Sequence, residues 1–302
     1  MDLEKQIEKI KKQPSIRALR EELFTVSGYK VIIGFVIVMF FIFVAIFAPF
    51  LSHYDPEERV ADDLLEPNSD HWFGTTRLGR DLYSRVIYGT RIALMVVFAA
   101  TAIAMSVGIT LGLISGYTAG KSDRALVLVM DALYAFPGIL LAILIIAAIG
   151  KGIWPAAIAV SVVYTPQYFR ITRNHVMSVK QEVFVKAAKA IGSPGKDTIL
   201  KYILPNVSQS IPVILTLNAA DGILTLAGLS FLGLGIEPPT PSWGYDLNKA
   251  WGMLSTADLY PQVWYYSVIP GVIIVVVIVG FTLLGEGLND ILNPQLREGK
   301  RQ

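Results

Sequence analysis

The residues that could carry catalysis or bind a metal are few and scattered along this 302-residue chain. There are no cysteines, which excludes disulfides, thiolate metal sites and cysteine nucleophiles. The three histidines, His53, His71 and His175, fall in expected loops without ligand spacing, and neither H-E-x-x-H nor G-x-S-x-G occurs. The sequence therefore predicts no catalytic residue, no metal site and no cofactor. The net charge of +2 gives no sign of a nucleic-acid partner.

One short stretch, Gly116 to Ser122, reads G-Y-T-A-G-K-S and looks at first like a phosphate-binding loop. That loop needs four residues between its glycines and a strand before it. Here three residues separate Gly116 from Gly120, and an apolar helix is expected to precede them. We interpret the stretch as a glycine turn at a helix end, and we expect no ATP hydrolysis by this chain itself.

Two carboxylates, Asp131 and Asp221, lie inside apolar stretches that are long enough to cross a membrane. A charge in the middle of a bilayer costs roughly 2.5–3.5 kcal/mol, so such a side chain should face protein or water. Asp131 is expected near the inner end of its helix and Asp221 near the middle. The different depths argue against an acid dyad, in which both groups must meet.

The elements that position these residues follow from the composition. Apolar residues make up 53% of the chain and charged residues 17%, whereas a soluble domain carries about 25% charged residues. The apolar residues are gathered in blocks of about 20, the length of a transmembrane helix, and they do not alternate as in a barrel strand. We predict an all-α membrane protein. The six predicted transmembrane helices are residues 29–51, 92–120, 125–150, 153–169, 202–236 and 259–285.

The charges between these stretches predict an orientation. Most of the 26 Lys and Arg residues fall in an N-terminal arm (1–28), in the loop that begins at Arg170, and in a C-terminal tail (291–302). Because Lys and Arg are enriched on the cytoplasmic side, both termini are expected to be cytoplasmic. An outer loop is then expected at 52–89, with an amphipathic interfacial helix near 78–88. A core of five helices should follow at 90–290.

The cytoplasmic loop around 177–204 has a distinctive pattern. A helix is expected from Glu182 to Ile191, ended by G-S-P-G at 192–195, with a second short helix from Lys196. It should run into the next span near Pro205, which suits the first turn of a helix. A short helix lying parallel to the membrane suits docking to a cytoplasmic partner. An ordinary surface loop is the alternative.

Several short motifs occur together along the chain. They are H-W-F-G-T at 71–75 with L-G-R-D at 78–81, D-A-L-Y-A-F-P at 131–137, L-S-F-L-G-L-G at 229–235, P-P-T-P-S-W-G at 238–244, and L-L-G-E-G-L at 283–288. With the pattern A-A-x-x-x-G followed by I-L-P in the cytoplasmic loop, these motifs resemble the inner-membrane permease subunit of ABC importers of the dipeptide, oligopeptide and nickel class. The resemblance is to the C-type of the two permeases and covers about residues 15–298.

This resemblance implies a type I importer permease fold in the inner membrane of a prokaryote, in contact with membrane lipid. It implies a second, paralogous permease, two ATPase subunits and an external substrate-binding protein as partners. It also implies that the cytoplasmic loop couples to the ATPases. The coupling residues it implies are Lys186, Ala187, Ala188, Gly192, Ile203, Leu204 and Pro205. Lys186 departs from the family pattern, which has glutamate at this position.

The cargo expected from the resemblance is a di- or oligopeptide, with oligosaccharides and nickel chelates as alternatives. Asp221 is the candidate residue on the translocation path, where it would contact a cationic or polyhydroxylated cargo. Many relatives instead carry a glutamate where Leu226 stands here. A structural hydrogen bond to a neighbouring helix is the other interpretation of Asp221. An ion-driven secondary transporter using Asp131 and Asp221, and a membrane scaffold, remain as alternative functions.

Overall fold

The computed structural model describes residues 26–118, 120–254 and 263–292, in which helices are joined by loops, the longest at residues 52–81. The long helices are α3 (Val26–Ile46), α5 (Leu82–Thr118), α6 (Lys121–Ala135), α7 (Gly138–Ile149), α8 (Ile153–Val179), α12 (Ile211–Phe231), α13 (Trp243–Leu254) and α14 (Trp264–Leu292). The short segments are α4 (Ala48–Leu51), α9 (Val183–Ala190), α10 (Gly195–Asp197), η1 (Thr198–Ile203), α11 (Leu204–Val207) and η2 (Ser208–Ser210). Within these ranges the predicted all-α architecture is confirmed.

Four of the described helices, α3, α5, α12 and α14, are long and apolar enough to cross a membrane. The stretch expected as one straight span at 125–150 is broken instead into α6 and α7, which are bent by 98°. Pro137 explains the break, because it places Phe136 in an extended conformation that cannot continue the helix. Counting this pair as one span gives up to five, so the sixth span stays a prediction. The 27-residue α8 is long but less apolar.

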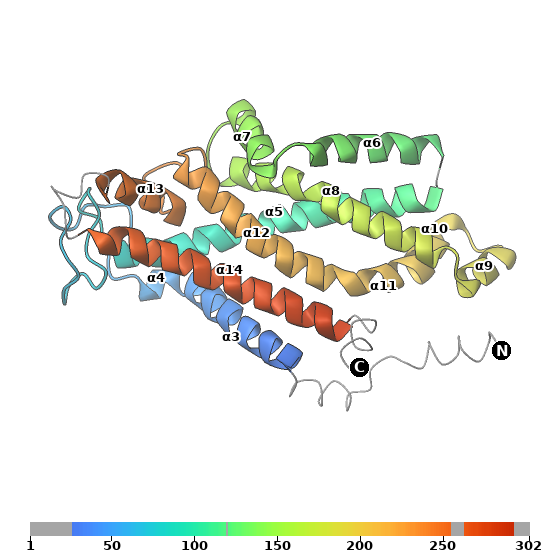
Figure 1. The fold of residues 1–302 in the computed structure, drawn as a ribbon, viewed down its shortest axis with the longest axis horizontal. Helices are drawn as coiled ribbons and strands as arrows, with labels where there is room; N and C mark the ends of the chain where they lie inside the picture. Colours follow the sequence, from blue (N-terminus) through green and yellow to red (C-terminus); the bar gives the residue numbers. More distant parts are fainter. Residues whose placement is uncertain (1–25, 119, 255–262, 293–302) are drawn as a thin grey trace.

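The helices run mainly along the long axis of the molecule (Figure 1), and the loops gather at its two ends. Residues 52–81 and α13 lie at one end, and α9 and α10 lie at the opposite end. Between them, α5, α8 and α12 form a central apolar core with α3, α7 and α14 against it. The sequence predicts that the loops at these two ends lie on opposite sides of the membrane.

α5 and α8 approach each other closely along their C-terminal halves. Gly108, Gly112 and Gly116 face α8 at intervals of four residues, which places them on one stripe of α5. A Cβ atom added to Gly112 would lie 2.8 Å from the carbonyl oxygen of Phe169, closer than side-chain atoms sit in real proteins. Small residues in this pattern allow helix backbones to pack directly in a membrane, where the hydrophobic effect does not drive association.

The outer loop differs from its prediction. No separate interfacial helix forms at 78–88, because α5 begins at Leu82 and continues unbroken into its apolar part. Leu82 and Val86 are buried against Tyr265, Tyr266 and residues of α13, so this segment packs inside the protein. The predicted first span corresponds to α3 followed by the single turn of α4. The N-terminal arm and the tail fall largely on residues 1–25 and 293–302, outside the described part of the chain.

Candidate functional site

The candidate coupling loop (residues 177–204) contains the helix that the sequence predicts. α9 spans Val183–Ala190 with Glu182 at its N-cap position. It ends where the backbone N–H groups of Gly192 and Ser193 donate to the carbonyls of Lys189 and Ala188, each at 3.0 Å. This is the Schellman arrangement, which needs a left-handed residue just after the helix. Gly192 supplies it with φ of 85°, so its glycine is required by backbone geometry.

The two faces of α9 have different environments. Val185 is buried against Val176 and Ile203, which joins α9 to α8 and η1, and Ala188 is buried as well. The opposite arc is apolar and exposed, and Ala187 lies at its centre with side chains three or four residues away on either side. The members of this exposed face of α9 are Val183, Phe184, Ala187, Ala190 and Ile191. Ile191 is 83% exposed, which is unusual for an isoleucine that no other molecule covers.

The predicted coupling residues therefore divide into two groups. Lys186, Ala187, Gly192 and Pro205 are exposed on the surface of the loop. Ala188, Ile203 and Leu204 pack against the chain itself; Ala188 is 3% and Ile203 0% exposed, and Leu204 is partly buried. Small size at Ala188 thus serves packing within this chain, whereas Ala187 faces outward.

The segment after Gly192 is helical but irregular. α10 leads through the π-helical turn η1 and the short α11 and η2 into α12. Pro205 lies in the first turn of α11, as expected from its missing N–H. Lys201 bonds to Asp197 one turn earlier at 2.8 Å, and this hydrogen bond raises the pKa of the Lys201 ammonium. The sequence predicts a helical restart here but gives no sign of the π-helical turn.

Charged side chains tie α6 to α8 near the coupling loop. Arg173 forms a two-point ion pair with Asp123, at 2.7 and 2.9 Å, and Asp123 also accepts a short hydrogen bond from Ser115 of α5. Asp131, one of the two candidate intramembrane carboxylates, pairs with Arg170 at 2.7 Å. These pairs fix α6 beside α8 and give Asp131 a structural partner, which sequence reasoning missed.

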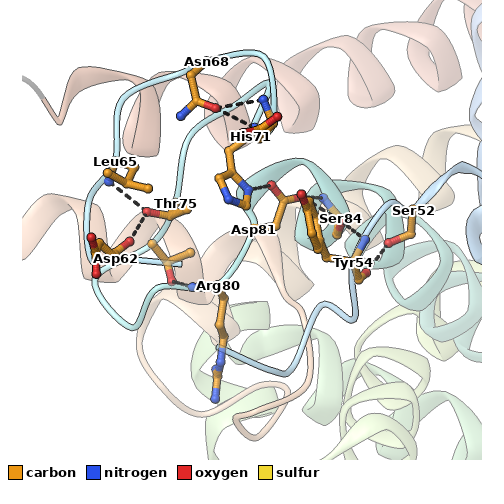
Figure 2. Close-up of polar contacts among 12 residues, drawn as sticks. Ser52, Tyr54, Asp62, Leu65, Asn68, His71, Thr75, Arg80, Asp81 and Ser84 are labelled. Atoms are coloured by element: carbon orange, nitrogen blue, oxygen red, sulfur yellow. Dashed lines mark hydrogen bonds and ion pairs between the residues drawn. The ribbon is translucent and has the colours of Figure 1, made fainter. Parts of the chain in front are cut away.

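The end of the molecule that carries residues 52–81 and α13, which we call the outer cap after its expected side of the membrane, contains a buried polar network centred on Asp81 (Figure 2). Its Oδ1 lies 2.9 Å from Nδ1 of His71, while its Oδ2 accepts from both the backbone N–H and the hydroxyl of Ser84, at 2.8 and 2.7 Å. Ser84 in turn accepts a hydrogen bond from the backbone of Tyr54. Asp81 thus caps α5 and connects three parts of the outer loop.

A second contact fixes this end to the rest of the protein. The guanidinium of Arg85, whose side chain is 1% exposed, binds Asp246 of α13 with N–O distances of 3.0 Å. It also donates to the carbonyls of Pro56 and Pro239, at 2.9 and 3.1 Å. Trp243, in the P-P-T-P-S-W-G motif, donates its indole N–H to the carbonyl of Val86. The L-G-R-D motif at 78–81 and the P-P-T-P-S-W-G motif at 238–244 therefore belong to the same folded cap.

Asp221, the other candidate carboxylate, is the eleventh of the 21 residues of α12 and so lies at the middle of this helix. Its side chain is exposed on the surface of the described chain, near Tyr164 of α8 and one turn before Thr225. Its depth in the membrane stays a prediction. Whether cargo passes this position stays a prediction.

Taken together, these features define a multi-pass membrane protein with a hydrogen-bonded outer cap at one end and a loop helix that presents an apolar face at the other end. Residues 108–298 match the family described as "binding-protein-dependent transport system inner membrane component", and residues 31–67 match the "N-terminal TM domain of oligopeptide transport permease C". The chain belongs to this family of inner-membrane permeases of ABC importers, as its motifs predict.

Named relatives match along nearly their whole length. The chain is 36% identical to the glutathione transport system permease protein GsiD of Pectobacterium atrosepticum, over 93% of this chain and 90% of the relative. It is 40% identical to the dipeptide transport system permease protein DppC of Alkalihalophilus pseudofirmus, over 88% and 86%. It is also 40% identical to a GsiD of Escherichia coli, over 86% and 84%. The predicted resemblance to the C-type permease is confirmed.

Proposed function

We propose that this chain forms half of the translocation channel of an ATP-driven importer of di- or oligopeptides. A second, paralogous permease forms the other half, two ATPase subunits supply the ATP hydrolysis, and an extracytoplasmic binding protein delivers the cargo. The observation that carries this proposal is the exposed apolar face of α9, at the end of the molecule opposite the outer cap. The relatives are named for glutathione and dipeptide transport, which favours peptides over oligosaccharides and nickel chelates.

The contacts of α9 support a mechanical role for the candidate coupling loop. An ATPase that binds the exposed face of α9 moves a helix whose other face is packed on Val176 of α8 and Ile203 of η1. The same cluster includes Leu113 of α5, which is locked to α8 by the glycine stripe. Motion of the ATPases is thereby passed to α5, α8 and α12 as one body, as in other interface-driven switches.

The experiment that tests this proposal is peptide uptake into proteoliposomes that contain both permeases, with the binding protein outside and ATP inside. Uptake of a labelled dipeptide is expected only when both ATPase subunits and ATP are present. Equal uptake without the ATPases, driven by an ion gradient, would instead establish the secondary transporter. That alternative requires both Asp131 and Asp221. Asp131 already has another role, because it pairs with Arg170.

The orientation is part of the proposal and has its own test. Because the native chain has no cysteine, single cysteines report their own exposure. Cysteine replacing Asp62 or Thr240 is expected to react with a membrane-impermeant thiol reagent added to intact cells. Cysteine replacing Ser193, next to α9, is expected to react only after the membrane is opened. Reaction at Ser193 with protection at Asp62 would reverse the orientation.

A further inference from the structure

Within residues 26–118, 120–254 and 263–292, the Asp221 carboxylate has no counter-charge. Among the residues that the structure describes, no side chain forms an ion pair or hydrogen bond with it. By contrast, the acids of α6, Asp123 and Asp131, are both paired with arginines of α8. A lone exposed carboxylate in the middle of an apolar helix cannot face lipid without a large cost. The surface around Asp221 must therefore face water or a polar occupant.

Two hydroxyl groups lie near this carboxylate, those of Thr225 and Tyr164. Thr225 is four residues after Asp221 and thus on the same face of α12. Its Oγ1 is 2.9 Å from the hydroxyl of Tyr164, which reaches across from α8. Both residues are partly exposed, so the hydroxyl pair borders the same surface as the carboxylate. The polar groups form a short strip, with one negative charge at its end.

The chemistry of this strip selects among possible ligands. A primary ammonium group carries three N–H donors and one positive charge, which a carboxylate and neighbouring hydroxyl oxygens can accept. A bound metal ion would need further ligands, and the described residues contain no group of three or more His, Asp or Glu side chains placed to hold one. A neutral, polyhydroxylated cargo would leave the charge uncompensated.

We propose that Asp221, Tyr164 and Thr225 form a subsite for the primary ammonium group of the cargo, which in a peptide is the N-terminal amine. This inference rests on the proposed function as a peptide importer. Only one charge and two neutral hydroxyls contribute, so contact at this subsite is weak enough for the cargo to leave again. That property suits a transport path, where binding must permit both entry and release.

The test uses the complete importer in proteoliposomes, with Ala-Ala as the cargo. Asp221→Asn is expected to lower uptake about tenfold while assembly and binding-protein-stimulated ATP hydrolysis stay near wild type, because hydrogen bonds to charged groups are the strong ones. Asp221→Glu keeps the charge and should restore most of the uptake. Thr225→Val and Tyr164→Phe should each give a smaller loss of about threefold. Leu224→Asn, a neighbouring exposed position, is the matched control and should change uptake less than twofold.

Three results would overturn the subsite. Uptake by Asp221→Asn within twofold of wild type would show that the charge has no role. Loss of the second permease from purified Asp221→Asn importer would show that the carboxylate holds the subunits together. An equal loss of uptake in Leu224→Asn would show that any polarity change at this surface is harmful. By contrast, absence of ATP-driven uptake in the wild-type importer would remove the proposed function itself.

Discussion

Replacing Ala187 with Trp is expected to lower ATP-driven peptide uptake by about one to two orders of magnitude while the chain remains folded in the membrane. Ala187 is at the centre of the exposed face of α9, so the indole projects outward without disturbing the chain's own core. In the assembled importer the ring would overfill the contact with the ATPase, and overpacking of this kind costs about 1–3 kcal/mol. Uptake and ATPase co-purification measure the effect.

Two variants make this prediction specific. Ala187→Ser keeps a small side chain and should transport like wild type. Ala188→Trp places the same ring one residue later, where the side chain is buried, and should instead destabilise the loop and reduce the yield of folded permease. Wild-type uptake by Ala187→Trp would show that α9 does not dock to the ATPase through this face.

The second large effect is expected at the outer cap. Replacing Arg85 with Met leaves Asp246 as a buried, unpaired carboxylate and frees the carbonyls of Pro56 and Pro239. Breaking a buried ion pair from one side costs about 3–5 kcal/mol. The purified variant should therefore unfold at a clearly lower temperature, and its outer loop should become sensitive to protease added outside.

A matched control lies in the same loop. Arg59 pairs with Asp63 at 3.0 Å, but both side chains are more than half exposed. Such surface pairs contribute about 0–1 kcal/mol, so Arg59→Met should leave the unfolding temperature almost unchanged. Equal effects of Arg59→Met and Arg85→Met would contradict the structural role assigned to the buried pair.

Local patterns in the sequence were sufficient to predict much of this fold. The long apolar stretches became helices, and the G-S-P-G break after α9 formed where glycine allows a left-handed turn. The prediction failed at 78–88, because an amphipathic pattern does not distinguish a helix on the membrane surface from one buried under α13 and α14. It also failed at Pro137, where an uncharged stretch of sufficient length conceals a sharp bend.

The site was harder to predict because it depends on contacts between distant residues. The sequence suggests which residues belong to the coupling loop, but only packing separates outward-facing Ala187 from inward-facing Ala188. The pairs Arg173–Asp123 and Arg85–Asp246 join residues 50 and 161 positions apart, and no local pattern indicates them. The glycines at 108, 112 and 116 were a usable signal, since their spacing of four is typical of close helix packing.

In the proposed mechanism, cytoplasmic ATPases drive this permease through α9, and photo-crosslinking detects that contact. Ala187→Cys introduces the only cysteine of the chain, and a benzophenone is attached to it. The importer is then assembled with this labelled permease and irradiated. The same probe at Thr240, in the outer loop, is the control. We expect a crosslinked product that contains an ATPase subunit from the probe at Ala187, and none from the probe at Thr240. Absence of an ATPase product at Ala187, or equal products from both positions, would contradict this mechanism.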